Sequence, residues 1–153
     1  MSLKKAIVIT NGELEQLQAG DYLETTDTVQ MTNGNANSIT VGQPVYVSDN
    51  DTVDLAQANA AATKSVFGLV VDATIAANAL GGVQTDGVMS SANWTAVTGG
   101  VNLTAGAEYY LDATNPGKLT VTPPSAGGDF VAPVGEGVSL TEFEINIERT
   151  VKL

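Results

Sequence analysis

The sequence feature that most constrains the fold of this chain is a segment that occurs twice. When residues 39–58 are moved forward by 64 positions they overlie residues 103–122. The residues that coincide are Thr40 with Thr104, Gly42 with Gly106, Tyr46 with Tyr110 and Leu55 with Leu119, and apolar Ile39, Val45 and Val47 fall on Leu103, Tyr109 and Leu111. Further on, Gly68 meets Gly135 if the later copy has a longer loop. The chain is therefore predicted to hold two related β modules, which are too few for a solenoid. The alternative is chance similarity, because short apolar and turn patterns recur in β proteins.

Each copy has the pattern of a β-hairpin followed by a third strand. In the later copy two β-favouring runs, 108–111 and 118–122, flank Asn115-Pro116-Gly117, a tripeptide suited to a tight turn. The diproline at 123–124 ends the second run, because neither ring nitrogen can donate to a ladder. A third strand is predicted over 130–134, leading into Gly135.

The earlier copy is predicted to have the same parts. Strands are expected over 43–47 and 53–58, with an acidic tip at 49–51. Residues 54–63 are rich in alanine and by propensity alone suit a helix, but the repeat places them on a strand, so strand or coil is predicted. The apolar run 66–71 is bounded by turn residues and predicts a buried central strand.

Outside the repeat, the first part of the chain is predicted to be an N-terminal segment of extended chain. Residues 6–10 are a short apolar strand followed by Asn11-Gly12, a strong turn signal. Residues 13–18 suit either a helical turn or a returning strand, and the alternation that follows favours extended chain. Residues 25–38 are rich in Thr, Asn and Gly and read as a linker.

The remaining segments also have the pattern of short strands. Gly81-Gly82 and Thr85-Asp86-Gly87 are predicted to mark one weaker hairpin, and Gly99-Gly100 another. Trp94 is predicted to lie in a core or a subunit contact. From 142 to 153 apolar and polar residues alternate, which predicts a strand with one buried face.

Together these patterns predict an all-β fold, a sandwich or barrel of short strands built from two related hairpin modules with an extended N-terminal segment. The predicted division of the chain is an N-terminal strand or arm and linker, 1–38, and a β body, 39–153. Within the body the repeat modules span about 39–72 and 103–138, and the C-terminal strand spans 142–153.

Composition removes several kinds of chemistry. The chain has no cysteine, which excludes disulfides and thiolate sites, and no histidine, the commonest general base and zinc ligand. Six basic against seventeen acidic residues give a net charge of −11, which repels phosphate backbones. We therefore expect a protein partner and no nucleic acid. No apolar run approaches the roughly 20 residues of a membrane span, so no membrane partner is expected.

The few basic residues gather at the two ends of the chain. Lys4, Lys5, Arg149 and Lys152 make up four of the six. If the ends are adjacent they form a basic spot on an acidic body, whereas the simpler interpretation is that these residues keep the terminal strands soluble.

No residue is singled out as catalytic, cofactor-binding or metal-binding. Paired acids such as Glu142 and Glu144 are usually a solvated strand face, so a glycosidase-like hydrolase is a minor alternative. The run 49–54 invites a calcium interpretation but lacks the glycine at position six and the glutamate at position twelve of an EF-hand loop. Gly81-Gly82 lacks the Gly-Lys-Ser/Thr of a phosphate loop. An acidic hairpin tip accounts better for 49–54.

Three stretches of the sequence resemble tailed-bacteriophage virion proteins, which include capsid decoration (cement) proteins and small tail or head-fibre proteins. The resemblance covers most of the chain outside 73–100. The stretches are Asn11-Gly12 with Glu15-Gln16-Leu17-Gln18-Ala19-Gly20-Asp21, the hairpin Tyr109-Tyr110-Leu111-Asp112-Ala113-Thr114 to Gly117-Lys118-Leu119-Thr120, and the ending Val134-Gly135 to Ser139 with Thr141-Glu142-Phe143 and Ile145.

The resemblance implies a nonenzymatic β protein, commonly a homotrimer, bound to the exterior of the virion capsid over contacts between major capsid protein subunits. A protein that binds the assembled shell but not its separated subunits stabilises the shell by mass action. We expect the N-terminal segment, 4–24, to contact the major capsid protein or a neighbouring copy. The alternative is a short tail or head-fibre protein, or a tail-associated protein involved in adsorption, although the chain is small and has no fibrous repeat.

Overall fold

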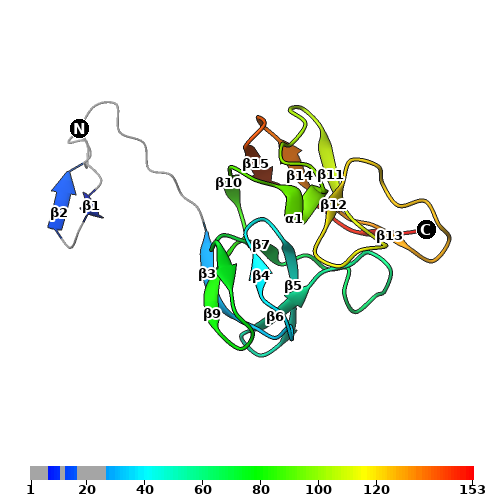
Figure 1. The fold of residues 1–153 in the computed structure, drawn as a ribbon, viewed down its shortest axis with the longest axis horizontal. Helices are drawn as coiled ribbons and strands as arrows, with labels where there is room; N and C mark the ends of the chain where they lie inside the picture. Colours follow the sequence, from blue (N-terminus) through cyan, green and yellow to red (C-terminus); the bar gives the residue numbers. More distant parts are fainter. Residues whose placement is uncertain (1–6, 11–12, 17–26) are drawn as a thin grey trace, which may run out of the picture.

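The computed structural model describes residues 7–10, 13–16 and 27–153. Residues 27–153, here called the body, consist of short β-strands with one four-residue helix, α1 (Thr95–Thr98). The prediction of an all-β fold built from two related modules is confirmed. In Figure 1 the first module lies below and the second above.

The first module is a small closed barrel. Its strands are arranged in the order β3-β6-β5-β7-β9, and β3 closes the barrel by pairing antiparallel with β9 and parallel with β6. The bounds are β3 (Thr28–Asn33), β5 (Pro44–Asp49), β6 (Thr52–Leu55), β7 (Gly68–Val70) and β9 (Leu80–Gln84). Two shorter strands, β4 (Ile39–Thr40) and β8 (Thr74–Ile75), pair with each other beside it.

The second module has the same strand order but stays open. Its sheet runs β10-β15-β14-β11-β12, and the first module, read from β3, runs β3-β9-β7-β5-β6. In both modules the first strand in the chain pairs with the last, β3 with β9 and β10 with β15. The hairpin, β5-β6 or β11-β12, lies at the other end of this strand order. The bounds are β10 (Gly87–Ser90), β11 (Glu108–Leu111), β12 (Leu119–Thr120), β14 (Pro133–Gly137) and β15 (Glu142–Ile145), and a separate pair is formed by β13 (Phe130–Val131) and β16 (Val151–Lys152).

The glycines that coincide in the sequence repeat have matching roles. Gly42 and Gly106 have φ angles of 83° and 73°, which a residue with a Cβ rarely adopts. The Gly42 N–H donates to the carbonyl of Val70 at 2.8 Å, and the Gly106 N–H donates to the carbonyl of Gly137 at 2.7 Å. Each glycine therefore joins the start of its hairpin to the third strand of its module.

A second pair of glycines lets neighbouring strands approach closely. A Cβ on Gly68 would overlap the carbonyl oxygen of Gln84, and a Cβ on Gly135 would overlap that of Glu144. Because both obstacles are backbone atoms of the module's last strand, neither position has room for a side chain. The match of Gly68 with Gly135 in the sequence thus has a common steric cause.

The core has two parts. The inside of the first barrel is filled by apolar side chains: Met31, Ile39, Val45, Val53, Val70, Ile75 and Val83. The larger part centres on Trp94, which is fully buried, with its ring 5.8 Å from that of Phe143. It also includes Ala56, Ala58 and Leu69 of the first module, so the two modules share it. The prediction that Trp94 is a core residue is confirmed.

Residues 56–58 connect the modules through the backbone. The Ala58 N–H donates to the carbonyl of Asp112 at 3.0 Å, and the Phe130 N–H donates to the carbonyl of Ala58 at 2.8 Å. The Gly117 N–H donates to the carbonyl of Ala56, also at 2.8 Å. The alanine-rich segment 54–63 holds no helix, as predicted, because its backbone bonds to the other module.

The structure corrects the alignment of the second strand of each hairpin. Val53 pairs with Val47, and Leu119 pairs with Leu111, so Leu119 takes the place of Val53 and not that of Leu55. The loop between β11 and β12 is longer than the tip between β5 and β6, which shifts the later strand along its partner. Val53 and Leu119 are both buried, whereas Leu55 is only half-buried.

The linker predicted over 25–38 is wrong for Thr28–Asn33, which form β3. Few apolar residues are needed there because the fully buried side chain of Asn33 forms hydrogen bonds. Its Nδ2 donates to the carbonyls of Ile75 at 2.9 Å and Asn37 at 3.0 Å, and its Oδ1 accepts the N–H of Asn35 at 2.8 Å. Asn33 thereby fixes a loop across the end of the barrel.

The prediction of two weaker hairpins is also wrong. Gly81 and Gly82 lie inside β9, where they leave room for the side chains of Ile75 and Val71. β9 and β10 follow each other in the chain but pair with other strands. Gly99 ends α1 with a φ of 82°, so it caps a helix and does not turn a hairpin.

Two predicted strands are broken. The strand expected over 130–134 divides at Ala132, whose carbonyl accepts the Leu111 N–H at 2.9 Å, into β13 and β14. The alternation expected from 142 to 153 holds through Ile147, which is partly buried against the core. Beyond it the chain crosses to pair with β13, and Val151 and Leu153 are 58% and 46% exposed.

In the N-terminal segment, β1 (Ile7–Thr10) pairs antiparallel with β2 (Glu13–Gln16). This confirms the predicted strand and the extended chain that follows it, over those residues. Lys4 and Lys5 lie outside the described residues, as does the basic spot predicted around them.

Candidate functional site and exposed surfaces

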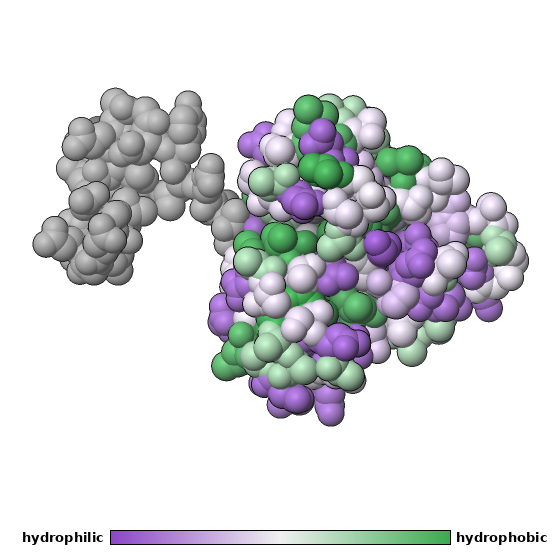
Figure 2. Space-filling view, in the orientation of Figure 1, coloured by the Kyte–Doolittle hydropathy of each residue, from purple (hydrophilic) through white to green (hydrophobic). Residues whose placement is uncertain are grey.

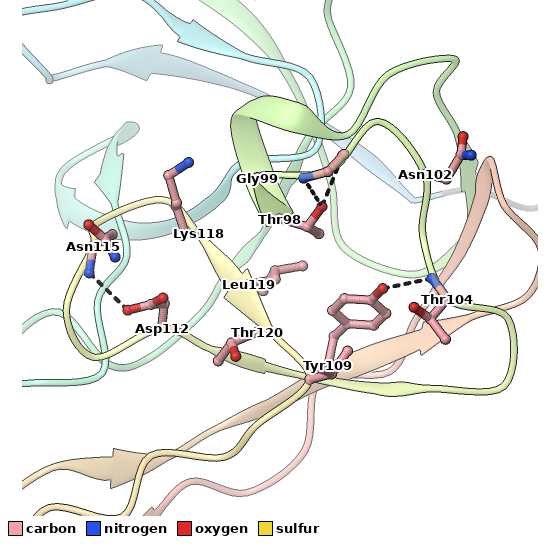
Figure 3. A pocket seen from close by; sticks show the side chains of 12 residues that line it. Thr98, Gly99, Asn102, Thr104, Tyr109, Asp112, Asn115, Lys118, Leu119 and Thr120 are labelled. Atoms are coloured by element: carbon pink, nitrogen blue, oxygen red, sulfur yellow. Dashed lines mark hydrogen bonds between the residues drawn. The ribbon is translucent and has the colours of Figure 1, made fainter.

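A large hollow lies at the open side of the second module. It has a volume of about 500 Å³ and lies between β12 and the segment that follows α1 (Figure 3). Thr98, Gly99, Gly100 and Asn102 line one wall, and Leu119, Thr120 and Val121 line the other. We call this hollow the seam. The remaining lining residues are Thr104, Tyr109, Asp112, Asn115 and Lys118.

Several polar groups of the seam are already bonded to the protein backbone. Oδ1 of Asp112 accepts the N–H groups of Thr114 at 2.6 Å and Asn115 at 2.9 Å. The Tyr109 hydroxyl accepts the Thr104 N–H at 2.9 Å, as Figure 3 shows. These bonds hold the walls in place, so the seam is a preformed groove of amide, hydroxyl and backbone groups.

A ladder of glutamates crosses the outer face of the second module. Glu108 pairs with Glu136, and Glu136 pairs with Glu144, so three carboxylates lie side by side on three strands. Like charges in directly opposed positions destabilise a sheet. The Tyr110 hydroxyl donates to Glu108, and that hydrogen bond raises the pKa of Tyr110 above 10.0. This face repels anions and suits a basic partner.

The acidic run 49–54 forms the predicted hairpin tip. Asp49 accepts the Asn50 N–H at 2.7 Å through Oδ1, and Oδ1 of Asp54 accepts the Asn35 amide and the Leu55 N–H, both at 2.7 Å. These carboxylates thus organise the turn. Across the part of the chain that the structure describes, no three Asp or Glu residues are grouped so as to hold a metal ion.

Exposed apolar residues gather on two neighbouring loops at the end of the second module. Val101 and Leu140 are each 56% exposed and Val138 is 49% exposed, and the loops are joined by a hydrogen bond from the Leu103 N–H to the Leu140 carbonyl at 2.9 Å. Figure 2 shows hydrophobic residues at the surface of this upper end. We call these three residues the apolar end. Such grouped apolar side chains suit contact with another protein.

Within the described ranges, no helix combines the length and apolar character that crossing a bilayer requires. Glu142 and Glu144, considered as a paired-acid site, are both exposed on β15, and Trp94 is enclosed in the core. Sequence reasoning missed the seam, because its walls come from segments that no motif relates.

Comparison with known proteins gives one structural similarity. No protein-family model matches the chain, and no curated protein matches it. Among solved structures, a chain from "The capsid of Myoviridae Phage XM1" is similar, with a TM-score of 0.46 and 16% sequence identity. The match covers 90% of this chain and 94% of that chain. At this identity and TM-score the similarity does not assign a function.

Proposed function

We propose that this protein is a bacteriophage capsid decoration protein, which binds the outer surface of the assembled head and stabilises it without performing a reaction. Its partner in this proposal is the major capsid protein, and the protein acts as a homotrimer. The sequence resemblance described above is the source of the virion assignment.

The observation that carries the proposal is the character of the exposed surface. The body presents three features suited to protein contact: the apolar end, the glutamate ladder and the open seam. They lie on one module, while the barrel of the first module is closed by β3 and supports the shared core. A rigid β body with several contact surfaces suits a protein that bridges subunits of a shell.

Stabilisation of the shell follows from binding alone. If the protein binds assembled capsid subunits and not separated ones, each bound copy adds free energy to the assembled state. At a free concentration one hundred times the dissociation constant, this amounts to about 2.7 kcal/mol per site. Summed over many sites, this resists opening of the shell.

The test is binding to heads that lack the protein. Full-length protein is expected to sediment with such heads and to raise the temperature at which they open. A chain without residues 1–24 is expected to lose this binding while the emission of Trp94 stays that of the folded body. Unchanged occupancy by the truncated chain would remove the N-terminal segment from the contact, and failure of the full-length protein to bind heads would contradict the proposed function.

A matched pair of substitutions tests the apolar end. Leu140→Asp places a charge among exposed apolar residues of the second module and is expected to weaken head binding. Leu80→Asp makes the same change at a leucine that is 69% exposed on β9 of the first module, and is expected to leave binding unchanged. Equal effects of the two changes would remove the apolar end from the contact.

A further inference from the structure

The two modules differ at the outer edge of the hairpin's second strand, which is β6 in the first module and β12 in the second. In the first module β3 covers the outer edge of β6: the Thr32 N–H donates to the carbonyl of Asp51 and the Gly34 N–H to the carbonyl of Val53, both at 2.8 Å. In the second module β10 and β12 lie at opposite edges of the sheet and do not pair. The place that β3 takes in the first barrel corresponds to the seam in the second.

The backbone of β12 is oriented to accept a further strand. The Asp112 N–H donates to the Lys118 carbonyl at 3.0 Å, so Lys118 faces β11. Backbone groups alternate in direction along an antiparallel pair, which turns the N–H and carbonyl of Leu119 toward the seam. Leu119 corresponds to Val53, whose carbonyl accepts from Gly34 in the closed barrel. Among the described residues, no backbone hydrogen bond between loops or elements reaches Leu119 from the seam side.

The path of the chain after β10 explains why this part of the chain does not pair with β12. After β10 the Ser91 N–H donates to the Thr141 carbonyl at 2.9 Å, so the chain continues along β15. It then forms α1, and the Trp94 side chain fills the core. The segment that would close the second barrel is therefore used elsewhere. In the described chain no strand pairs with the outer edge of β12, which is bounded by α1 and by the hydrogen bond from the Gly117 N–H to the carbonyl of Ala56.

The N-terminal hairpin is a strand pair that lacks a third strand. β1 and β2 pair with each other and, within the described residues, with no other strand. An isolated two-stranded hairpin is marginally stable in water, and a third strand stabilises it. β1 is the apolar member, with the sequence Ile-Val-Ile-Thr. The hairpin thus lacks a third strand, and the seam lacks the strand that closes the first barrel.

Chain length and charge allow the hairpin to reach a neighbouring molecule. Ten residues, 17–26, separate β2 from the body, and a ten-residue chain spans up to about 33 Å. Lys118 and Asp112 both line the seam, so their charges offset each other, and β1 has no charged residue. No charge therefore opposes entry of β1 into the seam.

We propose that β1 of a second copy of this chain enters the seam and pairs with β12, in the place that β3 takes beside β6. Each copy then donates a hairpin and receives one. Because the two contact surfaces differ, the contact is head-to-tail, and it closes into a ring when the rotation allows. The inference goes beyond capsid binding, because it assigns the surface through which copies join.

The test is the mass of the free protein in solution, with no capsid present. The full chain is expected to run as a closed oligomer, a whole multiple of 15.7 kDa, in light scattering. Ile9→Pro is expected to give a monomer, because β1 would become a central strand and proline cannot donate to a ladder. Val121→Asp, which places a charge in the seam, is also expected to give a monomer. Val47→Asp makes the same change at a valine of the first module with equal exposure, 49% against 50%, and is expected to keep the oligomer.

Mixing the two defective chains separates strand exchange from other kinds of association. The Ile9→Pro chain keeps its seam and the Val121→Asp chain keeps its hairpin, so together they are expected to form a one-to-one dimer of about twice 15.7 kDa that grows no further. Absence of this dimer overturns the proposal, as does an oligomer that survives either substitution.

A monomeric full chain also overturns it, and hydrogen exchange of β12 then identifies the occupant. If Ile9→Pro speeds exchange at β12 in a monomer, the chain's own hairpin occupies the seam. If it has no effect, the seam takes a segment of another protein or none. Capsid binding by a monomeric full chain would keep the capsid partner of the proposed function and would contradict its homotrimer.

Discussion

Replacing Gly135 by alanine is expected to destabilise the body by about 3 kcal/mol. A Cβ at Gly135 would overlap the carbonyl oxygen of Glu144 and would lie 2.7 Å from Cε1 of Phe143. β14 and β15 would have to separate. Overpacking of this kind costs about 1–3 kcal/mol, and each ladder hydrogen bond that is lost costs about 1 kcal/mol more.

The assay is thermal unfolding followed by circular dichroism and by the emission of Trp94. For a chain of this size a loss of about 3 kcal/mol lowers Tm by roughly 6–12 °C. Gly68→Ala should have a similar effect, because its Cβ would overlap the carbonyl oxygen of Gln84.

The matched control is Gly127→Ala. A Cβ there would have no atom within 4 Å, so its stability is expected to stay within about 0.5 kcal/mol of the unchanged protein. If Gly135→Ala unfolds at the same temperature as Gly127→Ala, the close approach of β14 and β15 is wrong, and with it the common steric role of the two repeat glycines.

Four further substitutions test the core, the first barrel and the glutamate ladder. Trp94→Ala is expected to cost about 3–5 kcal/mol and Trp94→Phe less, since phenylalanine keeps part of the contact with Phe143; equal losses in urea unfolding would contradict the packing. Asn33→Ala is expected to cost about 2–3 kcal/mol, because it removes the hydrogen bonds of a fully buried amide, and a change below 0.5 kcal/mol would rule out its role in the barrel. Tyr110 is expected to ionise above pH 10.0 and Glu108→Gln to lower its pKa, as measured by NMR titration. Because the pKa of Tyr110 is raised in the folded protein, any stability that this pair contributes is present below pH 10.0 and is lost as the pH rises through the folded pKa. An unchanged pKa of Tyr110 in Glu108→Gln would show that the hydrogen bond is not the cause.

The parts of the fold that sequence could predict are those fixed by local chemistry. The hairpin at 108–120 follows from its turn residues, and β7 follows from an apolar run bounded by turns. The matching glycines were visible because each has a backbone constraint that only glycine meets, a positive φ at Gly42 and a close approach at Gly68. Constraints of this kind leave a trace in the sequence.

The parts that sequence missed depend on long-range contacts. β3 has few apolar residues, since Asn33 takes part in the barrel through hydrogen bonds and not through apolar burial. The register of β12 depends on loop length, which shifted the alignment from Val53 to Leu55. The seam arises because the chain after β10 forms α1 instead of pairing with β12, a choice between two partners that no local pattern encodes.

The central claim is that this protein works by covering an assembled shell. The measurement that tests it most directly is the number and position of copies on purified virions, counted by quantitative mass spectrometry and located by imaging of labelled protein. The account predicts hundreds of copies spread over the exterior of the head. A handful of copies confined to the tail would contradict it and would indicate a tail or fibre protein instead.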